Sequence, residues 1–320
     1  MRPEEFHPDK FERGQKHALD LDLGPAAGGI NLPVLLARGS RTGKRLVTTA
    51  AVHGDEYEGV RAIFDVWQAL DPAAMAGDWL AVPVANPPAF WSGTRTSPLD
   101  QANLARVFPG SLEGGPSAAL AYHLARSVIA HADFYIDLHS AGIRWRMPTM
   151  AGYDANDPRS REAARLFGAK VIWGHPDRVE GRTISFAASQ GIPWLYTEAR
   201  GAGRIDPADL AVFVNGLWNL LRHLGIAPGE VRPAKLEFHL FGSGNVDAGL
   251  ASTQRGFFMP AVKLLDNVHA GQELGRLCDL HGQTIEVFRA PCDGLVAMLR
   301  EFPVVEPGEP LFLLAEEAGK

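Results

Sequence analysis

The stretch LVTTAAVHGDE, residues 46–56, joins a short apolar, β-branched run directly to chemically active side chains. Residues 46–52 have the composition of a strand that is buried on both faces, as in a parallel sheet. Apolar side chains then recur at helical spacing from Val60 to Trp67. This order predicts an α/β unit in which His53 and Glu56 follow the carboxyl end of a strand, where ligands gather in open sheets.

The alternation of strand and helix continues along the first two thirds of the chain. We predict further strands at residues 80–84, 134–138, 171–173 and 193–197. A helix is predicted at residues 118–132, and another begins with Asp206 and Pro207 and ends at Gly225. The pattern indicates an α/β fold with a mostly parallel mixed sheet and helices on both faces.

The character of the sequence changes after Gly225. Residues 227–233 (APGEVRP) resemble a linker, and short strand-like runs separated by Gly, Pro, Asn and Asp follow. We predict a catalytic domain over residues 1–228 and a small all-β module over residues 229–320, called the β module below. Its hairpin pattern resembles the barrel-sandwich fold of lipoyl and biotinyl domains. No lysine lies at the expected hairpin tip near Asp293, which favours a structural role over a carrier role.

The composition is that of an ordinary globular protein, with 46% hydrophobic and 21% charged residues. A net charge of −6 argues against the basic surface of a nucleic-acid-binding protein. No apolar run approaches the length of a membrane span, and the charged first residues do not resemble a signal peptide. Cys278 and Cys292 cannot form a disulfide framework. We therefore expect a cytoplasmic protein without a nucleic-acid or membrane partner.

His53, Glu56 and His139 form a candidate zinc site. His139 follows the predicted strand 134–138, so it should emerge at the same sheet edge as His53 and Glu56. Two imidazoles and one carboxylate leave a fourth zinc position open, as in catalytic zinc sites. Asp137 lies two residues before His139 on the same side of the strand, where it can orient the imidazole. A chance His-x-x-Glu pattern is the alternative, and the position at strand ends counts against it.

Three further side chains are candidates for catalysis or substrate binding. Glu198 ends another predicted strand and is the candidate general base and acid for zinc-assisted hydrolysis. Arg95 and Arg106 lie in the long Pro- and Gly-rich segment after Asn86, whose length favours a functional loop. A fixed arginine can stabilise the negative charge that develops on an attacked carbonyl.

The order of these motifs resembles the succinylglutamate desuccinylase/aspartoacylase family of the zinc-carboxypeptidase-like superfamily. The motifs are HGDEYEG at 53–59, NPPAF at 86–90, TRTSPLDQANLARVFPG at 94–110, DLHSAG at 137–142 and TEARG at 197–201. The resemblance covers most of the chain, including the β module, and it is strongest to the N-acetyl-diaminobutyrate deacetylase branch. As an ordered set, the motifs are far more specific than any one of them.

The resemblance implies a role for each candidate residue. Glu198 would be the general base and acid, Arg95 would polarise the scissile carbonyl, and Arg106 would hold a substrate carboxylate. The single Zn²⁺ of each chain would be bound by His53, Glu56 and His139.

One departure from the family pattern concerns substrate binding. The family has an Asn-Arg pair where this chain has Ala105-Arg106. Loss of an amide donor removes a hydrogen bond of roughly 0.5–3 kcal/mol. Further candidate substrate-binding residues are Asn103, Arg144 and Arg146, with Trp145 as the wall of an apolar acyl pocket. A solvated loop with incidental arginines is an equal alternative for residues 144–146.

These observations predict a zinc-dependent amidohydrolase that cleaves the amide of an N-acyl amino acid or a related small N-acyl amine. Two alternatives stay open: a zinc carboxypeptidase acting on short peptides, and a catalytically inactive metal-binding scaffold. A scaffold needs no base beside the metal, so Glu198 argues against it. The sequence leaves the acyl group, the amine and the oligomeric state open, although the β module offers a contact surface for a homo-oligomer.

Overall fold

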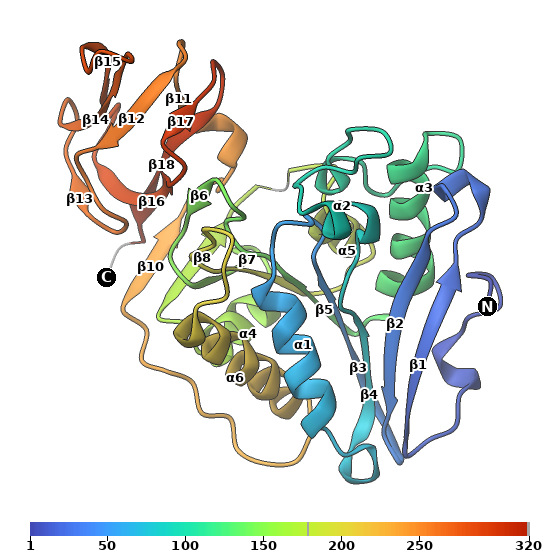
Figure 1. The fold of residues 1–320 in the computed structure, drawn as a ribbon. Coiled ribbons are helices and arrows are strands. Elements are labelled where there is room, and N and C mark those ends of the chain that lie inside the picture. Colours follow the sequence, from blue (N-terminus) through green and yellow to red (C-terminus); the bar gives the residue numbers. More distant parts are fainter. Residues whose placement is uncertain (178, 319–320) are drawn as a thin grey trace.

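The computed structural model describes residues 1–177 and 179–318. It consists of a large mixed sheet flanked by helices, with a small β structure at the carboxyl-terminal end (Figure 1). The strands before residue 200 are β1 (Gln15–Asp22), β2 (Asn31–Arg38), β3 (Arg41–Ala50), β4 (Ala76–Val82), β5 (Phe134–Leu138), β6 (Trp145–Arg146), β7 (Met150–Asp154), β8 (Val171–His175) and β9 (Trp194–Glu198).

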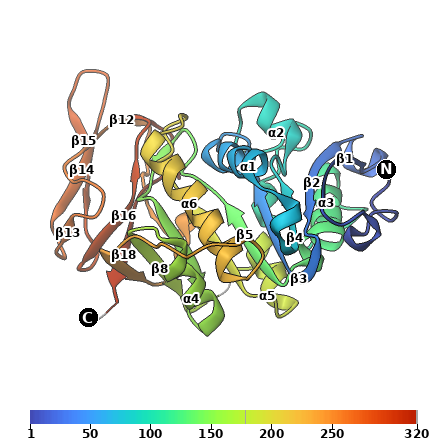
Figure 2. The ribbon, with the colours of Figure 1, turned by 90° about the horizontal axis from the view of Figure 1, so that it is seen from below.

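The helices cover both faces of this sheet. They are α1 (Glu58–Ala69), α2 (Pro87–Ser92), α3 (Pro116–His123), α4 (Pro158–Phe167), α5 (Thr183–Ser189) and α6 (Pro207–His223). Short 3₁₀ turns are η1 (Pro8–Lys10), η2 (Pro25–Ala27), η3 (Pro72–Ala74), η4 (Leu104–Arg106), η6 (Ile129–His131) and η7 (Val246–Ala248), and η5 (Leu124–Val128) is a π-helical turn. Helices α1, α4 and α6 pack together on one face, whereas α3 and α5 lie on the other (Figures 1 and 2).

Strand β5 lies in the middle of the strands that precede residue 200, and all five of its residues are buried. It pairs in parallel with β3 on one side and with β9 on the other. The carboxyl ends of these three strands therefore meet at one edge of the sheet. This is the edge at which the sequence predicted the site.

Side-chain alternation on β5 separates the two faces chemically. Phe134, Ile136 and Leu138 belong to the core under α1, α4 and α6. Tyr135 packs into the core on the α3 and α5 side. Because successive strand residues point to opposite faces, Asp137 and then His139 follow Tyr135 to that second side. The candidate site is thus built on the face that α3 and α5 cover.

The β module contains β10 (Phe238–Phe241), β11 (Leu250–Ala251), β12 (Gly256–Pro260), β13 (Asn267–Val268), β14 (Glu273–Cys278), β15 (Thr284–Arg289), β16 (Gly294–Arg300), β17 (Val304–Val305) and β18 (Pro310–Glu317). Four of these form a separate antiparallel sheet in the order β15-β14-β12-β17. Strand β10 pairs in parallel with β8 and antiparallel with β18, so it extends the large sheet into the β module.

The predicted fold class is confirmed: a mostly parallel mixed α/β sheet with helices on both faces, followed by a small antiparallel β structure. The structure adds the antiparallel pair β1 and β2, which the sequence analysis did not find. The predicted helix 118–132 begins at Pro116 and changes to π and 3₁₀ turns after His123. Over the described part of the chain, no helix has the length and apolar character needed to cross a membrane.

Candidate metal centre

The loop between β3 and α1 carries His53 and Glu56, and close packing fixes its path. A Cβ atom on Gly54 would collide with the backbone of Ala89 in α2, so this position requires glycine. Asp55 Oδ2 accepts a hydrogen bond from the Ile143 backbone N–H at 3.1 Å. Ile143 belongs to the loop that follows His139. The two loops that carry the candidate ligands are therefore tied to each other.

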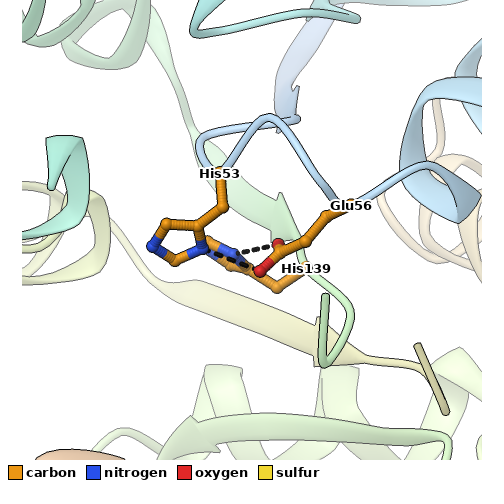
Figure 3. Close-up of side chains that lie close together, drawn as sticks. All are labelled: His53, Glu56 and His139. Carbon is orange, nitrogen blue, oxygen red and sulfur yellow. Dashed lines mark hydrogen bonds and ion pairs between the residues drawn. The ribbon is translucent and has the colours of Figure 1, made fainter. Parts of the chain in front are cut away.

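His53, Glu56 and His139 converge at the predicted sheet edge (Figure 3). Glu56 lies between the two rings, with Oε1 2.7 Å from His53 Nδ1 and Oε2 2.8 Å from His139 Nδ1. Each residue offers one ligand atom, and these three atoms lie within 4.8 Å of one another. Two imidazole nitrogens and one carboxylate oxygen form a donor set typical of catalytic zinc.

The far side of each imidazole is held by a hydrogen bond. His139 Nε2 lies 2.9 Å from Asp137 Oδ2, the orienting contact that the sequence predicted. His53 Nε2 lies 3.1 Å from Asn103 Oδ1. When Nε2 donates in these bonds, the Nδ1 lone pair of each ring is directed at the shared centre. Asn103, predicted to bind substrate, is thus placed behind a candidate metal ligand.

The charges around this centre favour a cation. Burial opposes the charged form of His139, but the carboxylates of Asp137 and Glu56 raise its pKa well above the ordinary value. Burial, together with the charge of Arg95, lowers the pKa of His53 to about 4, so this ring is neutral at pH 7 and able to act as a ligand. Two buried carboxylates on one imidazole therefore stabilise positive charge at this point. The residues fit a zinc ion.

Glu198, the last residue of β9, lies beside the centre in a cavity of about 150 Å³. Its Oε2 atom is buried and has no hydrogen-bond partner among the described residues. Burial, followed by the charge of Glu56, raises the pKa of Glu198 to about 8. A carboxyl group with this pKa can both accept and release a proton near neutral pH.

Arg95 and Arg106 both line this cavity, but their surroundings differ. Arg95 Nη1 lies 3.1 Å from Glu56 Oε1, so its guanidinium reaches the metal centre. Arg106 donates from Nε and Nη2 to one oxygen of Asp247, at 3.0 and 2.8 Å, and from Nη1 to the Ala105 carbonyl. Arg106 is thus bound to Asp247 and to the backbone of Ala105, whereas Arg95 reaches the candidate metal ligands.

Arg182, Tyr196 and Asp247 are polar cavity residues that the sequence analysis missed. Tyr196 lies two residues before Glu198 on a strand, so period-two alternation could have identified it. Arg182 precedes α5, and Asp247 belongs to η7 of the β module. Neither stands at a predicted strand end, so only the tertiary fold brings them to the cavity.

Arg144 and Arg146 do not line the cavity. Arg144 pairs with Glu309 at 2.6 Å and Arg146 with Glu301 at 3.4 Å, both in the β module. These two arginines were predicted as substrate contacts, but in the structure they join their loop to the β module. Trp145 between them does line the cavity, as predicted.

Comparison with known proteins identifies relatives over nearly the whole chain. Residues 42–224 match the family described as the succinylglutamate desuccinylase/aspartoacylase catalytic domain. The N-alpha-acetyl-L-2,4-diaminobutyric acid deacetylase of Halomonas elongata is 30% identical over 302 residues, which cover 91% of this chain and 87% of that protein.

Two solved structures show that the likeness includes the β module. The product-bound ectoine utilization protein EutE (DoeB) of Ruegeria pomeroyi matches with a TM-score of 0.86 and 26% identity, over 95% of this chain and 96% of that one. A succinylglutamate desuccinylase/aspartoacylase of Rhodobacter sphaeroides matches with a TM-score of 0.85 and 27% identity, over 96% and 98% of the two chains.

Replacing His139 by alanine removes one of three ligand atoms. We expect the His139→Ala protein to lose most of its zinc, because two remaining ligands hold the ion poorly. Elemental analysis after dialysis measures zinc per chain. His223→Ala, at the end of α6 and outside the centre, is the matched control and should keep its zinc. Full zinc occupancy in His139→Ala would contradict the ligand assignment.

Asn103→Ala tests whether this side chain orients His53. We expect a loss of about 10- to 100-fold in zinc affinity, the usual effect of removing a group that orients a ligand. Competition with a chromogenic chelator measures it. Asn103→Asp keeps the acceptor oxygen and should restore most of the affinity. A raised KM with unchanged zinc affinity would instead favour the substrate contact predicted from the sequence.

Proposed function

The chain belongs to the succinylglutamate desuccinylase/aspartoacylase family, and from this premise we propose that it is a zinc-dependent amidohydrolase that deacylates an N-acyl amino acid or a related small N-acyl amine. One observation carries the proposal: Glu198, whose Oε2 atom is buried and has no partner among the described residues, shares a cavity with His53 and His139 of the zinc-type donor set. The names of the relatives, a deacetylase and a desuccinylase, support a small acyl group on an amino acid.

His53, Glu56 and His139 would hold the zinc ion. When bound, zinc supplies Lewis-acid polarisation of the amide carbonyl and makes water more acidic. Glu198 takes a proton from the attacking water as its oxygen adds to the carbonyl carbon. Glu198 then gives this proton to the amide nitrogen as the carbon–nitrogen bond breaks, and a carboxylic acid and an amine leave. The raised pKa of Glu198 suits both steps.

Arg95 has the position to stabilise the oxygen that becomes negative during attack. Its guanidinium lies at the metal centre, 3.1 Å from Glu56 Oε1. A fixed cation in a partly buried site stabilises such charge more than it would in solution. We assign Arg95 this role, in agreement with the role that the family resemblance implies.

Two arginines would bind the carboxylate of the substrate. Arg182 is half-buried, lies close enough to Arg106 for the two charges to interact, and has a buried Nε atom without a partner among the described residues. Burial and the charge of Arg106 both lower the pKa of Arg182. An anion between the two guanidiniums would relieve their repulsion and use the Arg182 donor. We therefore add Arg182 to Arg106 as a carboxylate-binding residue.

The carboxylate of Asp247 competes with the substrate for Arg106. It already accepts two hydrogen bonds from Arg106, and its side chain is 60% exposed. A substrate carboxylate can enter by using Arg182 first. In this proposal, Arg182 provides the donor that is lost because Ala105 stands where the family has an asparagine. Arg144 and Arg146 are not assigned to substrate binding, because they contact the β module.

The size of the cavity bears on the peptidase alternative. The cavity has a volume of about 150 Å³, and Val246, Met298 and Pro310 of the β module form part of its wall. An acetyl or succinyl amino acid is a compact substrate, whereas a peptide would have to extend past this wall. The small volume favours the deacylase.

Glu198→Gln tests the proton transfer. We expect kcat to fall by about 10²- to 10⁴-fold, the usual contribution of a general acid–base group. The amide keeps the shape of the side chain, so zinc content should stay near that of the wild type. Steady-state kinetics and elemental analysis measure the two quantities. Unchanged turnover would remove Glu198 from the mechanism.

A substrate panel tests the proposed class together with Arg182. N-acetyl, N-succinyl and longer N-acyl amino acids are compared with dipeptides and with N-acyl amines that lack a carboxylate. Arg182→Gln should raise KM about 10- to 100-fold for carboxylate substrates, because a charge-assisted hydrogen bond contributes about 1.5–3 kcal/mol. Arg161→Gln, on α4 away from the cavity, is the control. Preferred cleavage of dipeptides would overturn the deacylase assignment.

A further inference from the structure

The loop after His139 contains the short strand β6, which pairs with a strand of the β module. Within β6, Trp145 pairs with Arg300 of β16 and Arg146 pairs with Leu299. The Arg144 carbonyl accepts hydrogen bonds from the backbone N–H groups of Glu301 and Phe302, at 2.9 and 3.2 Å. A loop that begins at a candidate metal ligand is thus held by residues almost 160 positions later in the sequence.

The indole of Trp145 is fixed from the side of the β module. Its Nε1–H donates to the Pro310 carbonyl at 2.8 Å. The Arg300 guanidinium lies 5.5 Å from the ring centroid. Arg300 is itself held, because its side chain is fully buried and donates to the carbonyls of Phe302 and Val304, each at 2.8 Å. The ring therefore has a defined orientation.

The same ring contacts Arg95. The Arg95 guanidinium lies 5.5 Å from the Trp145 centroid, a distance at which the electron-rich face attracts a cation. Its hydrogen bond within the described part of the chain goes to Glu56 Oε1. Glu56 is a candidate metal ligand, so a bound cation competes with Arg95 for this carboxylate. The Trp145 ring is the contact that does not depend on the state of Glu56.

We propose that Trp145 is a positioning residue: held by the β module, it keeps the Arg95 guanidinium at the place where charge develops on the substrate oxygen. The inference rests on the role of Arg95 in the proposed function. It assigns the β module a part in catalysis, because Pro310 and Arg300 orient the ring that orients Arg95.

This role differs from that of an apolar acyl-pocket wall, which Trp145 could also provide. Any side chain of similar apolar size could form a pocket wall, and loss of the wall would change KM and the preferred acyl length. A positioning ring needs an aromatic face, and its loss changes kcat while KM stays near its original value.

The first test compares Trp145→Leu with Trp145→Phe. We expect Trp145→Leu to lower kcat by about 10- to 30-fold, the range that a desolvated cation–π contact supports, with KM and zinc content unchanged. Trp145→Phe keeps an aromatic face and should recover most of this loss. Trp218→Leu on α6 is the matched control, because this ring also contacts an arginine, Arg222, but does not line the cavity, and it should have wild-type kcat.

A double-mutant cycle with Arg95→Gln separates positioning from general damage. If Trp145 acts through Arg95, Trp145→Leu should change kcat less than about twofold in the Arg95→Gln background. An undiminished effect there, or a change in acyl preference instead of kcat, would overturn the proposal. Thermal unfolding of each variant shows whether the fold is kept.

A second measurement needs no turnover. In the wild type, the ring should shift the Arg95 Nε–H proton resonance upfield, and Arg95→Lys identifies this signal. The shift should vanish in Trp145→Leu and persist in Trp145→Phe, both with zinc and after its removal by a chelator. A signal that is the same in all three proteins would refute the contact. Failure of the wild type on the substrate panel would refute the proposed function alone.

Discussion

The parallel pairing of β3, β5 and β9 is the constraint on which the rest of the site depends. It brings the carboxyl ends of three strands to one edge of the sheet. The last residues of these strands and the loops that follow them provide His53, Glu56, His139 and Glu198. None of these strands is next to another in the sequence, so helices and long connections must lie between them. The pairing of distant strands thus brings side chains that are far apart in the sequence close together in space.

This arrangement places carboxyl groups away from solvent, and the groups around them shift their pKa values in opposite directions. Desolvation opposes the charged form of Asp137, but the charge of His139 and the hydrogen bonds from His139, Thr183 and Thr49 lower its pKa. The Oε2 atom of Glu198 is buried without such a donor, and desolvation, followed by the charge of Glu56, raises the pKa of this carboxyl group. In the proposed function, these two carboxylates at the ends of neighbouring strands have different tasks: Asp137 holds the His139 ring in place, and Glu198 exchanges a proton. Their surroundings, and not their residue type, make the difference.

The sequence predicted the parts of the site that strand ends determine. Apolar runs locate β3, β5 and β9, and period-two alternation places Asp137 behind His139. The same reasoning fails for loops. Asn103 and Arg182 sit beside turns, and their neighbours depend on how distant segments pack. The strand β1 was missed because its residues are mostly half-exposed or exposed, as suits the edge of a sheet. Arg144 and Arg146 were misplaced because nothing in the sequence shows that β6 pairs with β16.

Strand pairing also explains why the β module forms part of the cavity wall. Strand β10 continues the large sheet from β8 to β18, so the hydrogen-bonded frame of the catalytic part runs directly into the module. A domain connected only by a flexible linker could not keep Asp247, Met298 and Pro310 at fixed positions in the cavity wall. A carrier domain must move, whereas this one shares a sheet with the part it faces. The continuity of the sheet therefore favours a module that shapes the cavity over one that carries a group. The likeness to solved structures agrees with this, because it extends beyond residues 42–224 and includes the module.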